Sequence, residues 1–247
     1  MEKKENEVTP SSPSNVRKSS RGVQLCENLS YAAKEAFKRL RENVLLALPK
    51  ETDGCAIIGV TSAQPAEGKS TISINTAFSF AELGKKVLVI DADLRRPSLH
   101  EKIGVSQTPG LSNLLSDSNS IGAAIKTYKS KTSDTSFDII TSGGIISNPS
   151  EVLTSDRMGK LLRALSSAYD YIFLDLPPVG VVIDAVSVGR YAEGMIVVIR
   201  ENHCSAPVFD DCIEQLRYAG IRILGFVVNG AVEGAGKKYQ YQSYRYY

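Results

Sequence analysis

Residues 57–71 decide the fold and read IIGVTSAQPAEGKST. The stretch begins as an apolar, β-prone run, breaks into a loop and ends in Gly-Lys-Ser-Thr. A phosphate-binding loop needs backbone N–H groups that can point at an anion, a Lys that reaches the β- and γ-phosphates, and a hydroxyl for Mg²⁺. Gly68, Lys69 and Ser70 supply these parts. The stretch therefore predicts a nucleotide-binding P-loop, with Ala63 where the consensus has its first glycine.

The residues that follow the loop support this interpretation. Apolar residues between Ser73 and Leu83 recur with helical spacing, so the loop joins a strand to a helix. An ordinary strand–helix turn with a surface lysine is the alternative. That alternative would be preferred if no matching carboxylates followed the loop.

Length and composition narrow the class of protein. A chain of 247 residues with 43% apolar content can bury a core the size of one α/β domain. A net charge of +2 does not favour general nucleic-acid binding, and four widely separated cysteines suggest neither a zinc ribbon nor a redox dithiol. The polar start and the absence of a run of about 18 apolar residues predict a cytoplasmic protein without a membrane span.

The first part of the chain divides into two segments. Residues 1–21 are rich in Ser, Pro, Lys and Glu, and we expect them to be disordered. Residues 31–48 carry apolar side chains three and four apart, which predicts an amphipathic helix ended by Pro49. Its other face carries a charged stripe, which is either solvated or in contact with a partner; the stripe consists of Glu35, Lys38 and Arg41.

Beyond the P-loop helix, apolar runs alternate with helical patterns. The predicted strands are residues 87–90, 137–141, 171–174, 195–199 and 223–228. The predicted helices are residues 111–115, 121–128, 149–165, 184–191 and 206–218. This alternation predicts an α/β fold with a mainly parallel sheet flanked by helices, formed by residues 22–230.

Three carboxylates follow two of the predicted strands. Asp91 and Asp93 come after one apolar run, and Asp175 comes after another. A lone Asp after a strand is usually a helix cap or a turn former. Because the carboxyl ends of parallel strands meet at one edge of a sheet, we expect all three to lie beside the P-loop, where phosphoryl transfer needs Mg²⁺ and a base.

These motifs together resemble those of a known family. The runs AxxxxGKST, DADLRRP (residues 91–97) and DLPP (residues 175–178) look like the Walker A, A′ and B motifs of the bacterial tyrosine kinases, the BY-kinases. The segment EAFKRLR (residues 35–41) resembles the oligomerisation motif of that family, with Lys38 in place of an arginine. The resemblance implies a P-loop NTPase fold of the deviant-Walker, MinD-like type. Ala66 stands where the family loop often has glycine.

The end of the chain is rich in tyrosine. Five of the eleven tyrosines lie in residues 239–247: Tyr239, Tyr241, Tyr244, Tyr246 and Tyr247. Such a tail could be an aromatic segment that stacks on other molecules, nucleic acid included. Joined to the kinase motifs, it is interpreted as a flexible tail of phospho-acceptors spanning residues 231–247.

The resemblance implies a role for each residue of the site. ATP and Mg²⁺ are the expected cofactors, with Lys69 holding the β- and γ-phosphates and Asp91 taking the proton of the attacking tyrosine. Mg²⁺ would be held by Ser70, Asp93 and Asp175. The residues expected to contact the nucleotide are Gln64, Pro65, Ala66, Glu67, Gly68, Lys69, Ser70 and Thr71, with Asn229 near the base.

The resemblance also implies partners. The kinase would phosphorylate itself within a homo-oligomer, possibly a ring, that the charged stripe helps to form, and would regulate the synthesis, chain length and export of capsular or extracellular polysaccharide. A membrane-embedded polysaccharide co-polymerase adaptor would recruit it to the inner face of the membrane, and a tyrosine phosphatase would reverse the modification. No nucleic acid is expected.

Two other functions remain open from the sequence. The first is a ParA- or MinD-like ATPase switch without kinase activity; such a switch would not need the tyrosine tail and carries an early P-loop lysine that is absent from residues 61–68. The second is an adaptor that binds through its aromatic tail. It would not need to bind ATP.

Overall fold

The computed structural model describes residues 26–49, 54–116 and 120–231. The predicted disordered segment, residues 1–21, and the five tail tyrosines lie outside the described residues. No helix in the described ranges is both long enough and apolar enough to cross a membrane.

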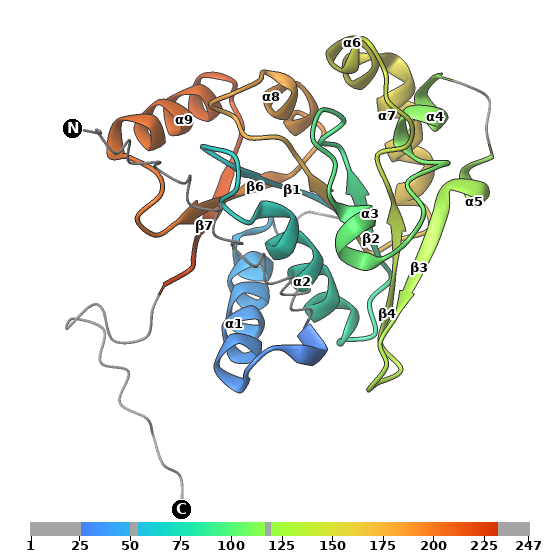
Figure 1. Ribbon diagram of the computed structural model, residues 1–247, viewed down its shortest axis with the longest axis horizontal. Coiled ribbons are helices and arrows are strands. Elements are labelled where there is room, and N and C mark those ends of the chain that lie inside the picture. The colour runs from blue at the N-terminus through green and yellow to red at the C-terminus, as the bar shows by residue number, and fades with distance from the viewer. Residues whose placement is uncertain (1–25, 50–53, 117–119, 232–247) are drawn as a thin grey trace, which may run out of the picture.

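The described part of the chain forms one seven-stranded sheet with the order β3-β4-β2-β5-β1-β6-β7 (Figure 1). Neighbouring strands run parallel except for β3, which is antiparallel to β4 at one edge. The strands are β1 (Ala56–Ser62), β2 (Val87–Asp91), β3 (Ile125–Lys129), β4 (Ser136–Ile140), β5 (Tyr171–Asp175), β6 (Gly194–Arg200) and β7 (Ile223–Asn229). The prediction of a mainly parallel α/β sheet is therefore confirmed.

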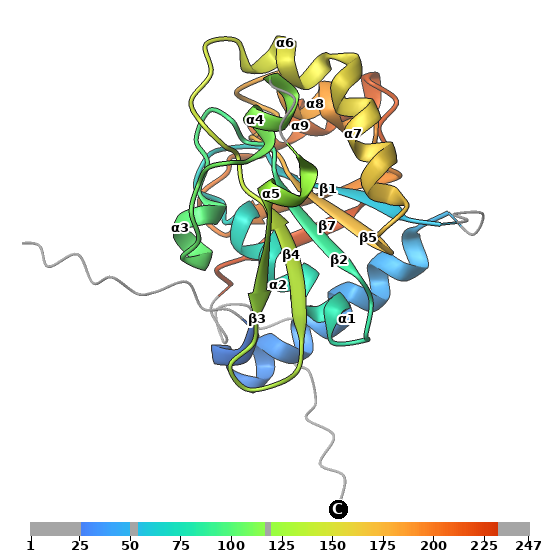
Figure 2. The ribbon, with the colours of Figure 1, turned by 90° about the vertical axis from the view of Figure 1, so that its right-hand side faces the viewer.

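Helices cover both faces of this sheet (Figures 1 and 2). One face carries α1 (Tyr31–Ala47), α2 (Lys69–Ala81) and α3 (Leu99–Ile103), with the short 3₁₀ helix Cys26–Asn28 before them. The other face carries α4 (Leu111–Ser116), α6 (Pro149–Thr154), α7 (Asp156–Ser166), α8 (Asp184–Gly189) and α9 (Ala206–Tyr218). The short helix α5 (Ile121–Ala124) leads into β3.

The central strands are mainly apolar because both of their faces are buried. In β1, Ile57 packs with the α7–α9 side, whereas Ile58 packs with the α1–α2 side. Leu88 and Val89 of β2 divide between the two sides in the same way. Successive side chains of a strand point to opposite faces, so a continuous apolar run fills two cores at once.

The structure corrects the sequence prediction in two places on the α4–α9 side. A helix was predicted at residues 121–128, and the prediction is wrong for its second half. Residues 125–129 form β3 and pair with β4. The helix predicted at residues 149–165 is interrupted at Ser155, whose extended backbone separates α6 from α7.

Strand register brings the predicted site residues together. Asp91 is the last residue of β2, and its register partner on β5 is Asp175. Asp175 is in turn paired with Val60 of β1, two residues before the strand gives way to the P-loop. The two carboxylates therefore lie side by side at the carboxyl edge of the sheet, as expected of a ligand site in an open α/β sheet.

Candidate active site

The P-loop bends through two backbone positions with positive φ. Gly68 has a φ of +94°, and a Cβ added there would lie 2.1 Å from Nδ2 of Asn229, so a side chain at this position would be strained and would displace Asn229. Ala66 has a φ of 64°, a left-handed conformation that is uncommon for a residue with a side chain. Helix α2 begins at Lys69, directly after this turn. The first N–H groups of a helix have no partner within it, so the start of α2 offers donors to an anion.

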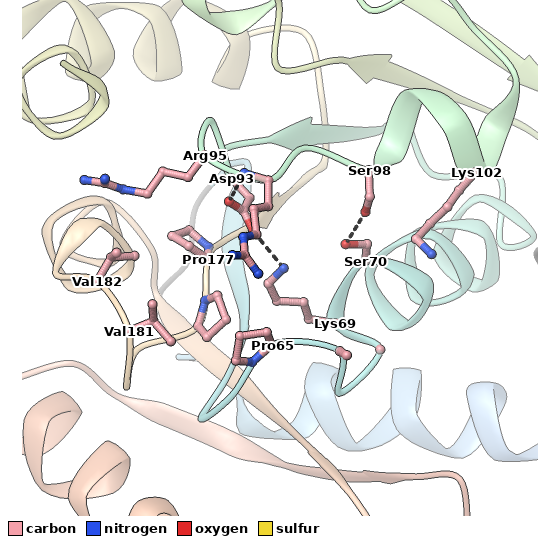
Figure 3. Close-up of a pocket in the computed structure, with 14 residues that line it drawn as sticks. Pro65, Lys69, Ser70, Asp93, Arg95, Ser98, Lys102, Pro177, Val181 and Val182 are labelled. Carbon is pink, nitrogen blue, oxygen red and sulfur yellow. Dashed lines mark hydrogen bonds and ion pairs between the residues drawn. The ribbon is translucent and has the colours of Figure 1, made fainter. Parts of the chain in front are cut away.

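An open cavity of about 580 Å³ lies beside the loop (Figure 3). Its lining combines P-loop residues with residues that follow β2 and β5. The lining residues are Pro65, Ala66, Gly68, Lys69, Ser70, Asp93, Arg95, Arg96, Ser98, Lys102, Pro177, Pro178, Val181 and Val182. Lys69 projects into the cavity toward Asp93 (Figure 3).

Lys69 and Asp93 form an ion pair of 2.9 Å that joins the P-loop to the loop after β2. Burial disfavours the charge on Lys69, but the nearby charges of Asp175 and Asp93 outweigh it, so the pKa of the ammonium group is raised. Oδ1 of Asp93 also accepts the backbone N–H of Arg96 at 3.0 Å. The cation needed for the phosphates is thus charged and held in place.

Asp91 and Asp175 are both buried. Burial, together with the charge of Asp175, raises the pKa of the Asp91 carboxyl well above its usual range. Burial also raises the pKa of Asp175, although the charge of Lys69 and the hydroxyl of Ser70 oppose this effect. Oδ2 of Asp91 accepts the backbone N–H of Leu99 at 3.2 Å, whereas its Oδ1 is buried and has no hydrogen-bond partner among the described residues. Asp91 therefore has a free oxygen that can accept a proton.

Hydroxyl groups of α2 face these carboxylates. Ser73 donates to Oδ1 of Asp175 at 3.3 Å. Ser70 accepts a hydrogen bond of 3.0 Å from the hydroxyl of Ser98, which follows the A′ motif (Figure 3). Among the described residues no group of three or more His, Cys, Asp and Glu side chains has the arrangement of a protein metal site. The hydroxyl and carboxylate oxygens that are present are the hard ligands that Mg²⁺ prefers.

The loop after β2 is anchored on its far side. Nε of Arg95 donates to the buried carboxylate of Asp184 at 2.7 Å, and the hydroxyl of Ser150 bridges the two residues. This contact ties the A′ loop to the beginnings of α6 and α8. Sequence reasoning did not assign a role to Asp184 or Ser150, because nothing in their local pattern marks them.

Contacts from β6 and β7 fix the other side of the P-loop. The carboxylate of Glu67 is fully buried and accepts the backbone N–H groups of Gln64 (2.8 Å) and Arg200 (3.2 Å). The side-chain amide of Asn229, predicted to lie near the base, donates to the carbonyl of Glu67 at 2.9 Å. His203 and Arg200 also contact loop carbonyls, and no sequence motif marks either of them.

The charged stripe on α1 does not line the cavity. Glu35 and Lys38 form an exposed ion pair of 2.8 Å. Arg41, in contrast, is buried and donates to the carbonyl oxygen of Ser79 on α2 at 2.7 Å. Only Glu35 and Lys38 of the three stripe residues therefore lie at the surface, because Arg41 turns toward α2.

Comparison with known proteins agrees with this geometry. A family model described as an AAA domain matches residues 55–216. The tyrosine-protein kinase YwqD of Bacillus subtilis is 35% identical over 207 residues, which cover 84% of this chain and 85% of that protein. The chain spans only 29% of the length of several longer relatives that are also named tyrosine-protein kinases.

Solved structures separate two related groups. The kinase domain of the Escherichia coli tyrosine kinase ETK superposes with a TM-score of 0.79 at 33% identity, covering 89% of this chain and 84% of that one. The septum site-determining protein MinD of Pyrococcus horikoshii, complexed with Mg-ADP, gives 0.57 at 26% identity and 72% coverage of each chain. The fold is thus that of the nucleotide-binding P-loop NTPases, as the sequence predicts, and the stronger likeness is to the kinases. With its P-loop, its paired carboxylates and a relative matched over most of its length, the chain belongs to the bacterial tyrosine-protein kinases.

Proposed function

We propose that this protein transfers the γ-phosphoryl group of ATP to tyrosines of its own C-terminal tail, acting between subunits of a homo-oligomer. The observation that carries the proposal is the buried, unbonded Oδ1 of Asp91 close to the Lys69–Asp93 ion pair, whose two residues line a cavity open to solvent. A base with a raised pKa next to a phosphate-binding cation is what transfer to a hydroxyl requires.

The chain's residues divide the reaction between them. Lys69 and the N–H groups at the start of α2 hold the β- and γ-phosphates. Asp91 accepts the proton of the tyrosine hydroxyl. The tyrosine oxygen then bonds to the γ-phosphorus as the bond between that phosphorus and the oxygen leaving with ADP breaks. Val181 and Val182 line the cavity with apolar surface, against which an aromatic ring can pack.

The oxygen ligands fit a magnesium ion. Ser70 would hold it directly, with Asp175 and Asp93 acting directly or through water. When bound, Mg²⁺ neutralises charge that develops on the phosphate oxygens. Because Asp93 pairs with Lys69 and Asp175 accepts from Ser73, both carboxylates are oriented by other side chains.

The proposal extends to the chain's setting. Residues 231–247 serve as the acceptor tail, and phosphorylation there regulates capsular or extracellular polysaccharide synthesis. A membrane-embedded co-polymerase adaptor recruits the kinase to the cytoplasmic face of the membrane, and a phosphatase resets it. The name of one relative, a putative tyrosine-protein kinase in the cps region of Klebsiella pneumoniae, supports this setting.

Mass spectrometry after incubation of the purified protein with Mg²⁺-ATP tests the proposal. We expect phosphate on several of the five tail tyrosines, and none when all five are changed to Phe in a protein that still binds ATP. The matched control is Asp91→Asn, which should bind ATP and leave the tail unmodified. ATP hydrolysis with no phosphotyrosine on the unmodified tail would instead favour a MinD-like switch.

A further inference from the structure

Three successive carbonyl oxygens of the P-loop, those of residues 65–67, each lie within hydrogen-bond distance of a side chain from outside the loop. Their partners, in order, are Nε2 of His203 at 3.0 Å, Nη1 of Arg200 at 3.2 Å and Nδ2 of Asn229 at 2.9 Å. Arg200 ends β6, His203 lies in the turn before α9, and Asn229 ends β7. We call these three side chains the carbonyl clamp.

The clamp determines where the loop's N–H groups point. A trans peptide is planar, with its C=O and N–H directed to opposite sides. Holding the carbonyls of residues 65–67 on the β6–β7 side therefore turns the N–H groups of residues 66–68 to the other side. Pro65, Ala66 and Gly68 line the cavity, so that side is the cavity. A row of backbone N–H groups facing a cavity is an anion-binding nest.

A second contact keeps the loop from relaxing. The carboxylate of Glu67 accepts the backbone N–H of Arg200. Arg200 and the loop are therefore joined by two hydrogen bonds, one from its side chain and one from its backbone. The loop also contains Ala66 in a left-handed conformation, which is held against its own preference. External contacts are thus needed to fix the shape that the loop sequence alone does not favour.

We propose that Arg200 and His203, together with Asn229, are positioning residues that orient the P-loop amides toward the nucleotide phosphates. None of the three belongs to the Walker motifs. The inference rests on the proposed function only in that the anion is a nucleotide phosphate. It gives Asn229 a role on the loop that does not require contact with the base.

Two side chains of the clamp can be removed without opening the core. Arg200 and His203 are exposed, so their loss leaves no cavity in the protein. Loss of a hydrogen bond of this kind changes a binding equilibrium by about three- to tenfold. Each single Ala variant should therefore bind Mg²⁺-ADP more weakly by about that factor. His203→Gln retains an N–H donor and should lose less than His203→Ala.

The experiment compares a phosphate-bearing ligand with one that has none. Calorimetry measures the affinity for Mg²⁺-ADP, and NMR titration measures the affinity for adenosine. Both are applied to Arg200→Ala, His203→Ala, their double variant and Asn229→Ala. Arg222→Ala is the matched control, because it removes an exposed charge just before β7, at the end remote from the P-loop. We expect the double variant to lose about tenfold or more in ADP affinity. For Arg200→Ala, His203→Ala and their double variant, adenosine binding and the melting temperature of the nucleotide-free protein should not change.

Three results would overturn the inference. One is unchanged ADP affinity in the folded double variant, and another is an equal loss for adenosine and ADP, which would assign these residues to the base or ribose. The third is a similar loss in Arg222→Ala. Absence of tyrosine transfer in a wild-type protein that binds ADP would refute the proposed function alone and leave the clamp intact.

Discussion

Nζ of Lys69 lies 2.9 Å from Oδ2 of Asp93, and the two side chains are only 13% and 4% exposed. This pair joins the loop that holds phosphate to the loop that carries the A′ motif. Each residue compensates part of the charge of a largely buried partner. Lys69 therefore has a structural role in the nucleotide-free protein in addition to its role toward phosphate.

Changing Lys69 to Met should abolish tail phosphorylation and also lower stability. The phosphates lose their cation, and Asp93 is left as a buried carboxylate that keeps the hydrogen bond from the N–H of Arg96 but has lost its ion-pair partner. We expect a loss of about 1–3 kcal/mol in the free energy of unfolding. Chemical denaturation measures it, with Lys69→Met/Asp93→Asn as the control, which should regain stability and remain inactive. Equal stability of the single and double variants would show that the pair has no structural role.

Changing Asp91 to Asn should stabilise the magnesium-free protein at neutral pH. Burial raises the pKa of Asp91 in the folded state, so the stability contributed by its protonated form is fully present below the unfolded pKa of about 3.9 and is lost as pH rises through the folded pKa. Asn does not titrate, so the variant's advantage should be absent in acid and should grow with pH. Melting temperatures of the variant and the wild type, measured in chelator from acid to neutral pH, test whether the variant's advantage grows with pH.

The same variant separates catalysis from binding. Asn retains an oxygen that can accept the N–H of Leu99 but cannot take a proton, so turnover should fall far more than nucleotide affinity. An advantage in melting temperature that shrinks as pH rises would contradict the raised pKa. Equal losses of turnover and affinity would indicate a metal ligand instead.

The parts of the fold that could be predicted are those in which local pattern and burial agree. Strand β2 is apolar up to its final Asp91 because both faces are covered, and α2 follows a loop whose glycine and lysine mark its beginning. Strand β3 could not be predicted, since residues 125–129 are half-exposed and become a strand only by pairing with β4. Its sequence is equally compatible with a helix that continues α5.

The site divides along the same line. Lys69, Asp91 and Asp175 were predictable because each follows a strand or opens a helix at the carboxyl edge of the sheet. Arg200 and His203 were not, because their role depends on a turn more than 130 residues away folding back over the P-loop. Helical spacing likewise could not show that Arg41 leaves the exposed face of α1 to reach α2.

Gly68→Ala should impair nucleotide binding far more than Gly84→Ala, although both glycines have a positive φ. At both Gly68 (φ +94°) and Gly84 (φ +74°), Ala adopts a left-handed backbone at a cost of about 1 kcal/mol. At Gly84 the added Cβ meets nothing within 4 Å, whereas at Gly68 it meets Asn229 at 2.1 Å. Gly68→Ala should therefore also lose nucleotide binding. Calorimetry with Mg²⁺-ADP on both variants tests this, and similar affinities would contradict it.

Because Arg41 is buried, assembly through α1 must be tested with the other two stripe residues. Arg41→Ala removes hydrogen bonds to the carbonyl and hydroxyl of Ser79 and should cost about 1–3 kcal/mol at every protein concentration. Glu35→Ala/Lys38→Ala removes an exposed pair and should cost under about 1 kcal/mol in the monomer. If α1 lies at a subunit contact, the double variant should still lower the assembly's mass in light scattering. An unchanged mass, in a wild type that does assemble, would mean that Glu35 and Lys38 form only a solvated face.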